Sequence, residues 1–430
     1  MKALLAFLAL VWSTTALASP VLVISLDGLR AVDARDGARM PVLARLRSEG
    51  MAASGVTPGW PSLTYPSHAT LVTGVSPARH GIGGNEAFDP TGALHGGWMW
   101  YADAIRADTL WAAARRSGLA SAAINWPVSV GAGVDWNLPQ IWRNRDAGDA
   151  NLLGGVETAG LAEALAPAVG AAYPLGSDPS CAADDLRARY AGALIAAHHP
   201  DLMLLHLECL DHSQHDFGPG SAEAHTAMAE LDGIVGRLVV AVRAAIPGVT
   251  IVVVSDHGFA PVNTAINLHA AFRAAGLEGA GGNWRAYPWQ MGGTAAIVLH
   301  DRANGTTRRE VASLLARLAG QRRLGIAKVT RGGAGGTTRA SFWIAFRPGF
   351  TSGGDASGPL VQRAQISGMH GYPPNEAAMS AVFIMAGPGV REGCKVGRID
   401  MRSVAPAIAR VLDVRLRDAR QGGLGAMCRR

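Results

Sequence analysis

The stretch VLVISLDGLR, residues 21–30, begins with a run of strand length and passes directly into Asp27. Three later apolar runs follow the same plan and end in polar clusters, at Ser121 to Asn125, Leu202 to Leu207 and Val249 to Ser255. Near-continuous hydrophobicity of this length is typical of strands that are buried on both faces, as in a parallel sheet. These runs therefore predict the central strands of one sheet.

Helical patterns lie between the predicted strands, most clearly at Asp108 to Ser117 and Ser221 to Ala245. Apolar residues recur at helical spacing in the second segment: Met228, Leu231, Val235, Leu238 and Val242. Strands that alternate with helices indicate a layered α/β domain. Core character returns at Ala378 to Ala386, and a C-terminal helix is predicted near Asp400 to Val414.

Residues 261–365 differ in character from the sequence on either side. They hold two Gly-rich pieces, GGAGGTTR and TSGGDASG, a helical pattern at Thr307 to Ala319 and a short strand pattern at Thr294 to His300. GGAGG lacks the Lys-Ser/Thr of a phosphate-binding loop, which favours a flexible turn. We expect this region to be an insertion or cap within one catalytic domain, residues 19–430.

The first 18 residues have the order of a secretory signal peptide: a basic start, an apolar run from Ala3 to Trp12, and small residues at 16–18. A membrane anchor is the alternative, but the run is shorter than the roughly 20 apolar residues that a spanning helix needs. No later segment is long and apolar enough to span a bilayer. The sequence predicts cleavage after Ala18 and a periplasmic or secreted protein.

The composition limits the class of protein. Of 430 residues, 49% are hydrophobic and 17% charged, which supplies a sizeable core and excludes disorder throughout. The formal net charge of +6 is slight for this length, and no block of Lys and Arg is present. A nucleic-acid-binding module is therefore disfavoured, whereas a mild attraction for small anionic substrates fits the charge.

Four cysteines remain after the predicted cleavage: Cys181, Cys209, Cys394 and Cys428. In an oxidising compartment they can pair in three ways, and spacing does not choose among them. A bond between Cys394 and Cys428 would tie down the C-terminal tail. Cys209 lies in an apolar strand pattern, which is also compatible with a buried free thiol.

Acidic and imidazole side chains gather just after the predicted strands, where ligands bind in open α/β sheets. They are Asp27, Asp211, His215, Asp256 and His257, to which a loop adds His370. Taken singly, each has an ordinary structural explanation, such as a helix-surface pair for Asp211 and His215 or a helix cap for Asp27. Together, three carboxylates and three imidazoles can supply the ligands of two zinc ions that stay open to substrate.

The segment TPGWPSLTYPSHATLVTG, residues 57–74, offers a nucleophile for such a site. Pro66 suits a first helical turn, with SHATLVTG behind it, so the Thr64 hydroxyl would lie beside a helix N-terminus that attracts phosphate. A bound zinc ion would lower the pKa of this hydroxyl. The alternative is helix capping by Thr64, Ser62 or Ser67.

These blocks resemble the nucleotide pyrophosphatase/phosphodiesterase family of the alkaline phosphatase superfamily. The likeness runs through VISLDGLR, LTYPSHATLVTGVSPARHGIGGNEAFDP, DHSQHDFGPGS, VVVSDHGFAPV and SGMHGYPP in the family's order. The resemblance implies an alkaline phosphatase-like α/β fold in three layers, with a mostly parallel central sheet flanked by helices and a smaller inserted cap. It also implies hydrolysis of phosphate diester or pyrophosphate bonds of a small anionic ester, with nucleotide-like substrates as one option.

The resemblance implies a role for each site residue. One zinc ion would be held by Asp211, His215 and His370, and the other by Asp27, Asp256 and His257, with Thr64 at the second ion. Thr64 would form a phospho-threonine that water then releases with net retention at phosphorus. Asn85 and the Thr64 backbone N–H would bind a non-bridging phosphate oxygen. Tyr65 matches an aromatic residue that packs against the organic group of the substrate.

Two positions depart from the family pattern: His206 stands where many relatives have tyrosine, and Gln214 replaces the usual glycine. Nucleobase stacking is therefore a weaker expectation than hydrolysis. Four tryptophans are candidates for a pocket wall, although tryptophan is more often part of a core: Trp60, Trp98, Trp100 and Trp126.

Four other functions are the alternatives to this hydrolysis. A phosphomonoesterase or a phosphonate hydrolase of the same superfamily would use the same metal site and nucleophile. A sulfatase is disfavoured because no Cys or Ser replaces Thr64. A non-catalytic binding protein would not need the full set of ligands together with a nucleophile.

Overall fold

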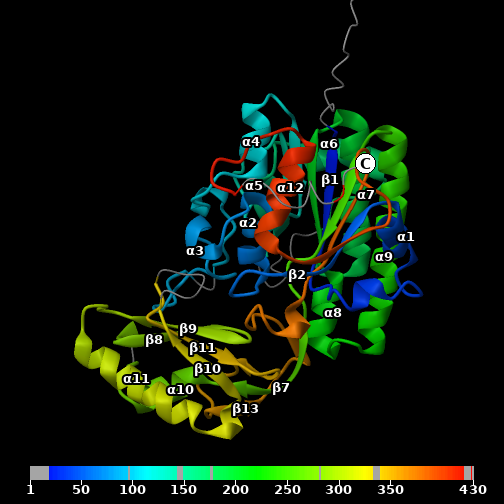
Figure 1. Ribbon diagram of the computed structural model, residues 1–430. Helices are drawn as coiled ribbons and strands as arrows, with labels where there is room; N and C mark the ends of the chain where they lie inside the picture. The colour runs from blue at the N-terminus through cyan, green and yellow to red at the C-terminus, as the bar shows by residue number, and fades with distance from the viewer. Residues whose placement is uncertain are drawn as a thin grey trace, which may run out of the picture.

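The computed structural model describes residues 19–94, 97–142, 149–174, 178–279, 282–332, 339–420 and 428. The predicted signal peptide and the predicted turn at GGAGG lie largely outside these residues. An eight-stranded sheet with the strand order β16-β2-β15-β6-β1-β5-β3-β4 forms the centre of the larger part of the described chain (Figure 1). Its strands are β1 (Val21–Leu26), β2 (Met51–Thr57), β3 (Ser121–Ile124), β4 (Trp136–Leu138), β5 (Leu202–Leu207), β6 (Thr250–Val254), β15 (Phe383–Ala386) and β16 (Cys394–Asp400).

The sheet is mostly parallel, and β15 alone runs antiparallel to its two neighbours within it. Successive side chains of a strand point to opposite faces. In β1, Leu22, Ile24 and Leu26 belong to one apolar core, whereas Val21 and Val23 belong to the other. Both faces of the sheet are therefore buried, as the continuous hydrophobicity of residues 21–26 predicts.

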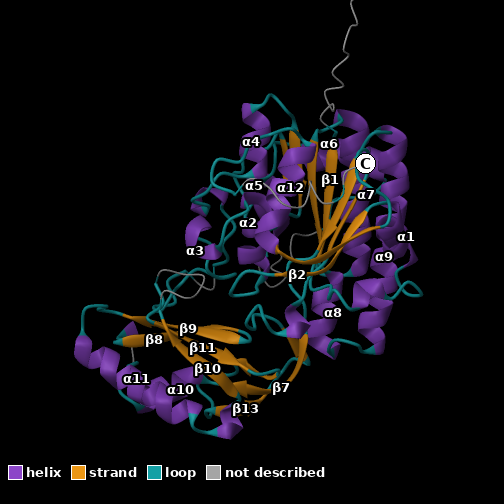
Figure 2. Ribbon diagram, viewed as in Figure 1, coloured by secondary structure: helices purple, strands orange, loops and turns teal. Residues whose placement is uncertain are grey.

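Helices cover both faces of this sheet (Figure 2). The core that contains Leu22 is closed by α1 (Pro41–Glu49), α6 (Leu161–Val169), α7 (Cys181–His198), α8 (Cys209–Phe217) and α9 (Ala222–Ala245). The opposite core is closed by α2 (Thr64–Thr73), α4 (Leu110–Arg116) and α12 (Val404–Val411). The shorter helices α3 (Pro77–His80) and α5 (Asp149–Val156) complete this part. The predicted α/β fold in three layers is confirmed.

The observed helix ends follow from capping. α9 begins at Ala222 because Ser221 is its N-cap and accepts a hydrogen bond from the Ala224 N–H. Thr109 caps α4 in the same way. The predicted C-terminal helix is shorter than expected, because residues 401–403 form a 3₁₀ turn before α12.

A smaller part of the fold contains residues 261–365, the segment that was expected to be an insertion or cap. Its antiparallel sheet has the order β10-β11-β9-β8 and packs against two helices, through residues such as Phe272, Leu315 and Ile344. These elements are β8 (Ala286–Met291), β9 (Thr294–Leu299), β10 (Ile326–Arg331), β11 (Phe342–Phe346), α10 (Leu268–Ala274) and α11 (Gly305–Ala319). Beside them, β7 (Ala260–Ile266) pairs with β12 (Gly349–Ser352), β13 (Val361–Arg363) and β14 (Gly368–Met369).

The cysteines form two disulfides, Cys181–Cys209 and Cys394–Cys428. The alternative of a free buried thiol at Cys209 is therefore wrong. The apolar pattern of β5 continues to this residue in the sequence, but Cys209 begins α8 and its sulfur reaches the first residue of α7. Among the described residues, no helix combines the length and apolarity needed to cross a membrane.

Candidate active site

Three neighbouring strands of the large sheet end at the same edge, and each leads into candidate site residues. β6, β1 and β5 lie side by side and run parallel, so their carboxyl ends meet. Asp27 follows β1, Asp256 and His257 follow β6, and α8 begins just after β5. The buried strands thus bring together residues that are far apart in the sequence.

The six predicted metal ligands lie in two groups. The ligand atoms of Asp211, His215 and His370 lie within 4.8 Å of one another, and so do those of Asp27, Asp256 and His257. Asp211 and His215 are one turn apart on α8, and their Oδ2 and Nε2 atoms are 3.4 Å apart. The rings of His257 and His370 stack with their centroids 3.8 Å apart, so the two groups adjoin.

The three histidine rings are all held through Nδ1. This atom lies 3.0 Å from the Gly368 carbonyl oxygen in His215, 3.2 Å from that of Gly258 in His257, and 3.2 Å from that of Ser62 in His370. A carbonyl oxygen only accepts, so each Nδ1 carries the proton and each Nε2 presents a lone pair. The Nε2 atoms face carboxylate oxygens at 3.1 to 3.8 Å. Two acceptors facing each other are stabilised by a cation between them.

One oxygen of each carboxylate lacks a hydrogen-bond partner within the described part of the chain. Asp27 Oδ1, Asp211 Oδ1 and Asp256 Oδ2 are buried and have no hydrogen-bond partner among the described residues. Burial raises the pKa of Asp211 and of Asp256 to about 7, and Asp211 adds to the effect at Asp256. Burial, helped by the neighbouring Asp256, also raises the pKa of Asp27 well above its usual value. A bound cation would neutralise the negative charge of these buried carboxylates.

The histidines are suited to be neutral ligands, because burial lowers the pKa of His215 to about 4 and places those of His257 and His370 well below the usual value. Neutral imidazole and carboxylate oxygen are the donors that zinc and similar divalent cations accept. Each group offers three protein ligands, which leaves a coordination position for substrate. The arrangement therefore fits divalent metal ions.

Thr64 lies at the second of these groups. Its Oγ1 is 3.3 Å from His257 Nε2, and its carbonyl oxygen is held by His68 Nδ1 at 2.8 Å. α2 begins at Thr64, earlier than the SHATLVTG segment behind Pro66, and the Thr64 hydroxyl makes no capping hydrogen bond. The hydroxyl is thus directed to the ligand cluster. The backbone N–H of Thr64 lies beside it at the start of the helix, whereas the Tyr65 N–H is bonded to Asn85 and Pro66 has none.

Asn85 lies next to Thr64 in space. Its Oδ1 accepts a hydrogen bond from the Tyr65 backbone N–H at 2.9 Å, which leaves the Nδ2 donors free to face the cavity that Asn85 lines. The segment around it is held by strand-like pairing, in which the Met99 N–H donates to the Asn85 carbonyl and Glu86 pairs with Trp98. An amide donor is therefore fixed at the cavity wall beside Thr64.

A cavity of about 330 Å³ opens over both ligand groups, between the large sheet and the smaller part of the fold. Thr64, Asn85 and His370 line it, together with Trp98, Trp142 and Trp289. Trp289 comes from β8 and packs closely on the loop at Gly84, since a Cβ on Gly84 would lie only 2.9 Å from its ring. Both parts of the fold thus contribute to one pocket.

The aromatic residues proposed for the pocket are corrected by the structure. Of the four tryptophans, only Trp98 lines the cavity; Trp126 is fully buried in the core, and Trp60 packs against Trp343. The Tyr65 ring is fully buried and contacts the edge of Trp98, so the ring itself does not line the cavity. A residue in the first turn of a helix can face either the ligand or the core, and residue type alone does not decide which.

The comparisons with known proteins can be set against this geometry. Residues 21–373 match the family described as type I phosphodiesterase / nucleotide pyrophosphatase. The chain belongs to this family. Human ectonucleotide pyrophosphatase/phosphodiesterase family member 1 is 26% identical over 251 residues, which are 56% of this chain and 23% of the human protein. An uncharacterized pyrophosphatase/phosphodiesterase of Schizosaccharomyces pombe is 29% identical over 266 residues, 58% of this chain and 47% of the yeast protein.

Solved structures of the family share the fold. Human ectonucleotide pyrophosphatase/phosphodiesterase 5 superposes with a TM-score of 0.69 at 18% identity, covering 95% of this chain and 99% of that one. An inactive variant of the murine protein, solved in complex with AMP, superposes with a TM-score of 0.68 at 18% identity, covering 94% and 97%. The alkaline phosphatase-like fold of this family member is thus independently supported.

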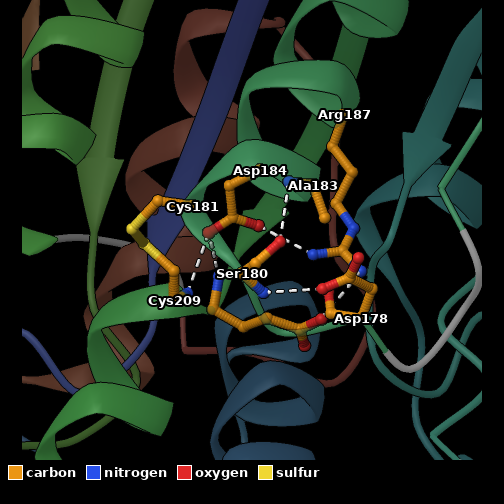
Figure 3. Close-up of a disulfide and its surroundings, with 8 residues drawn as sticks. Asp178, Ser180, Cys181, Ala183, Asp184, Arg187 and Cys209 are labelled. Carbon is orange, nitrogen blue, oxygen red and sulfur yellow. Dashed lines mark hydrogen bonds and ion pairs between the residues drawn. A yellow bond between two sulfur atoms is a disulfide. The ribbon is translucent and has the colours of Figure 1, made fainter. Parts of the chain in front are cut away.

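In this member of the phosphodiesterase family, a buried network that the sequence did not reveal fixes the start of α8. Asp184 of α7 accepts hydrogen bonds from the backbone N–H groups of Glu208 and Cys209, both at 2.8 Å (Figure 3). The fully buried Arg187 lies 2.8 Å from Asp184 and 2.9 Å from Glu208. In the sequence, Asp184 and Arg187 look like a solvated i,i+3 helix pair, so only burial distinguishes them.

The disulfide Cys181–Cys209 reinforces this junction, because it joins the first residues of α7 and α8 two positions before Asp211. We expect the double replacement by alanine to lower the free energy of unfolding by roughly 3 kcal/mol and to weaken metal binding at the Asp211 group. Chemical denaturation and metal titration would measure the two effects.

The second disulfide is a matched control. Cys394–Cys428 closes a loop of 34 residues against 28 for Cys181–Cys209, and it lies at the start of β16, at the edge of the sheet opposite the site. Its removal should cost a similar amount of stability without a change in metal affinity. Equal losses of metal affinity in both double variants would contradict the positioning role of Cys181–Cys209.

Proposed function

We propose that this chain is an exported, zinc-dependent phosphodiesterase or nucleotide pyrophosphatase that works through a covalent phospho-threonine. One observation carries the proposal: three imidazole lone pairs and three unpartnered carboxylate oxygens converge beside the Thr64 hydroxyl. The proposed ligands are Asp211, His215 and His370 for one zinc ion, and Asp27, Asp256, His257 and Thr64 for the other. The chain spans 23% of the human relative and 47% of the yeast relative, so its activity is proposed from its own site.

The residues of the chain divide the chemistry among them. Bound zinc would act as a Lewis acid that lowers the pKa of the Thr64 hydroxyl and stabilises charge on the phosphoryl group. Thr64 Oγ1 releases its proton to solvent and forms a bond to phosphorus, while the bond from phosphorus to the leaving oxygen breaks and the electron pair departs with that oxygen, which takes up a proton. Water then attacks phosphorus, the bond from phosphorus to Thr64 Oγ1 breaks, and a proton from the water restores the Thr64 hydroxyl. Two in-line displacements give net retention at phosphorus.

The transferred phosphoryl group would be held by donors that are already in place. Asn85 Nδ2 and the backbone N–H of Thr64, at the start of α2, would donate to the oxygens that carry the growing charge. Trp98, Trp142 and Trp289 form aromatic walls of the cavity. Such aromatic walls suit an ester with an organic group, and the AMP complex of the murine structural relative supports a nucleotide-like substrate.

Export is supported by two kinds of observation. The first 18 residues have the pattern of a signal peptide, and all four cysteines are paired in disulfides. Disulfides persist in oxidising compartments such as the periplasm or the cell exterior. The human relative is named as an ectonucleotide pyrophosphatase/phosphodiesterase, which agrees with this location.

The proposed function is tested by zinc content together with substrate preference. Purified protein is analysed by mass spectrometry for bound metal, and turnover is measured for nitrophenyl esters of a phosphodiester, a phosphomonoester, a phosphonate and a sulfate. We expect two zinc ions per chain and highest kcat/KM for the diester. Preference for the monoester or the phosphonate would favour the alternative hydrolases of the superfamily. A protein that binds no metal and turns over none of the esters would favour the non-catalytic binding protein.

A further inference from the structure

His206 is a fully buried residue of β5 whose ring lies beside a proposed metal ligand. Its Nε2 is 3.0 Å from Asp27 Oδ2, and its Nδ1 is 3.1 Å from the Asn125 carbonyl oxygen. The ring does not line the cavity, so it does not replace the tyrosine of the family pattern as a contact to the substrate. Its contacts point instead to a role in holding Asp27.

The two oxygens of Asp27 are used differently. Oδ2 is bonded to His206, whereas Oδ1 is buried without a hydrogen-bond partner and lies 3.4 Å from His257 Nε2. A carboxylate ligand is commonly oriented by a hydrogen bond to the oxygen that faces away from the metal. The pattern at Asp27 has this form, with Oδ1 directed into the ligand group.

The position of the proton on His206 follows from its neighbours. A carboxylate only accepts, so Asp27 favours a proton on Nε2. At Nδ1 the neighbours compete, since the Asn125 carbonyl accepts at 3.1 Å and Gln140 Nε2 can donate at 3.5 Å. The hydrogen bond to the charged Asp27 carboxylate is the stronger one, so the proton resides on Nε2 of His206.

A chain of buried contacts supports this ring from behind. Gln140 Nε2 donates to Glu208 Oε2 at 2.6 Å, which fixes the amide with its nitrogen on the side of His206. Glu208 is paired in turn with Arg187, which also contacts Asp184 of α7, the residue that accepts from the N–H groups at the start of α8. Asp27 in one ligand group is thereby linked through side chains to the helix that carries Asp211 and His215 of the other.

We propose that His206 is a positioning residue that donates from Nε2 to Asp27 Oδ2 and so holds Asp27 Oδ1 toward the cation of the Asp27, Asp256 and His257 group. This inference rests on the proposed function in one respect, namely that the site binds two zinc ions. It assigns a role to His206, which belongs to none of the ligand motifs. That role is to set the affinity for the zinc ion of the Asp27, Asp256 and His257 group.

The test is a zinc titration of the metal-free protein in competition with a chromophoric chelator, which needs no substrate. His206→Asn and His206→Gln form a matched pair, because both place a neutral amide in the site but only the longer glutamine carries its N–H to the position of Nε2. We expect His206→Asn to bind one of the two zinc ions about 10- to 100-fold more weakly, with the other unchanged. His206→Gln should restore binding to near the wild-type value.

A control separates this effect from loss of a buried histidine. His80 is also fully buried, bonds to Thr70 Oγ1 at 3.0 Å and touches none of the proposed ligands. His80→Asn should lower thermal stability and leave both zinc affinities as in the wild type. A change in zinc affinity in this variant would overturn the specific role of His206.

The remaining outcomes are distinct from one another. Wild-type protein that takes up no zinc would overturn the proposed function. Wild-type protein that takes up two zinc ions, together with a His206→Asn variant that binds both as tightly, would overturn only the positioning role. Equal weakening in the asparagine and glutamine variants would show that the N–H donor at Nε2 is not what holds Asp27.

Discussion

Replacement of Thr64 by alanine is expected to lower kcat by about 10⁴-fold or more, while both zinc ions stay bound. The hydroxyl is the one group that would form a bond to phosphorus, whereas the six Asp and His ligands remain in place without it. The hydroxyl also makes no helix cap, so the fold should tolerate its loss. Steady-state kinetics on the preferred diester and metal analysis of the same preparation give the two readouts.

Thr73 provides a control for this substitution, because it lies on the same helix and its hydroxyl donates to the Ala69 carbonyl at 2.7 Å. Thr73→Ala should lose some stability and keep its turnover. If Thr64→Ala instead turned over at a rate near that of the wild type, the nucleophile would have been assigned to the wrong residue. Trapping of a phosphorylated chain in the wild type, and not in Thr64→Ala, would support the assignment directly.

Replacement of Asp256 by asparagine is expected to have opposite effects on activity and on the stability of the metal-free protein. Asp256 Oδ2 is buried without a hydrogen-bond partner, while Oδ1 accepts from the Gly28 N–H at 3.2 Å. An asparagine oxygen can keep the contact with Gly28, and the substitution removes a buried charge. Loss of a zinc ligand should reduce kcat roughly 10³-fold, since a metal ion supplies several kcal/mol of charge stabilisation.

The gain in stability depends on pH in a defined direction. Burial, and then Asp211, raises the pKa of Asp256 from 3.8 to about 7. Between these values the folded, metal-free chain holds a proton that the unfolded chain has released, so the free energy of unfolding falls as pH rises from 4 to 7. Asp256→Asn removes this contribution. The metal-free variant should therefore exceed the wild type in stability at neutral pH and match it near pH 4.

Denaturant unfolding with and without zinc would measure these effects. Zinc at about 1,000 times its Kd would stabilise the wild type by roughly 4 kcal/mol, and the variant by less, so the stability advantage of the variant shrinks on addition of the metal. Asp108→Asn serves as the contrasting control, because Asp108 accepts from Arg116 at 2.6 and 2.7 Å away from the site. That variant should lose stability with or without zinc. A metal-free Asp256→Asn protein less stable than the wild type at neutral pH would contradict the reasoning.

The strands and the site residues that follow them were predictable from the sequence because their pattern is local. A continuously apolar run such as Val21 to Leu26 predicts a strand that is buried on both faces. Burial of an acidic residue directly after it costs free energy unless a partner neutralises the charge. Placement of such residues at one edge then follows from parallel strands. The role of each ligand and of Thr64 stays a prediction until the variants above are measured.

Other features could not be inferred from the sequence, because they depend on contacts between distant segments. Trp142 and Trp289 enter the cavity wall from two parts of the fold, and nothing in their local sequence distinguishes them from Trp126 in the core. Tyr65 shows the reverse case, since its type suggested contact with the substrate and its position in α2 buries the ring. Side-chain direction on a helix is set by what packs against it.

The layered α/β fold, the family and the order of the chemical groups can be inferred from local sequence, because hydrophobic period and residue type act over short stretches of chain. Long-range packing is needed to establish which cysteines pair, which aromatic rings reach the cavity, and that His206 faces Asp27 rather than the substrate. Each of these depends on the close packing of segments that are remote in sequence, where a difference of one side-chain direction selects a different partner.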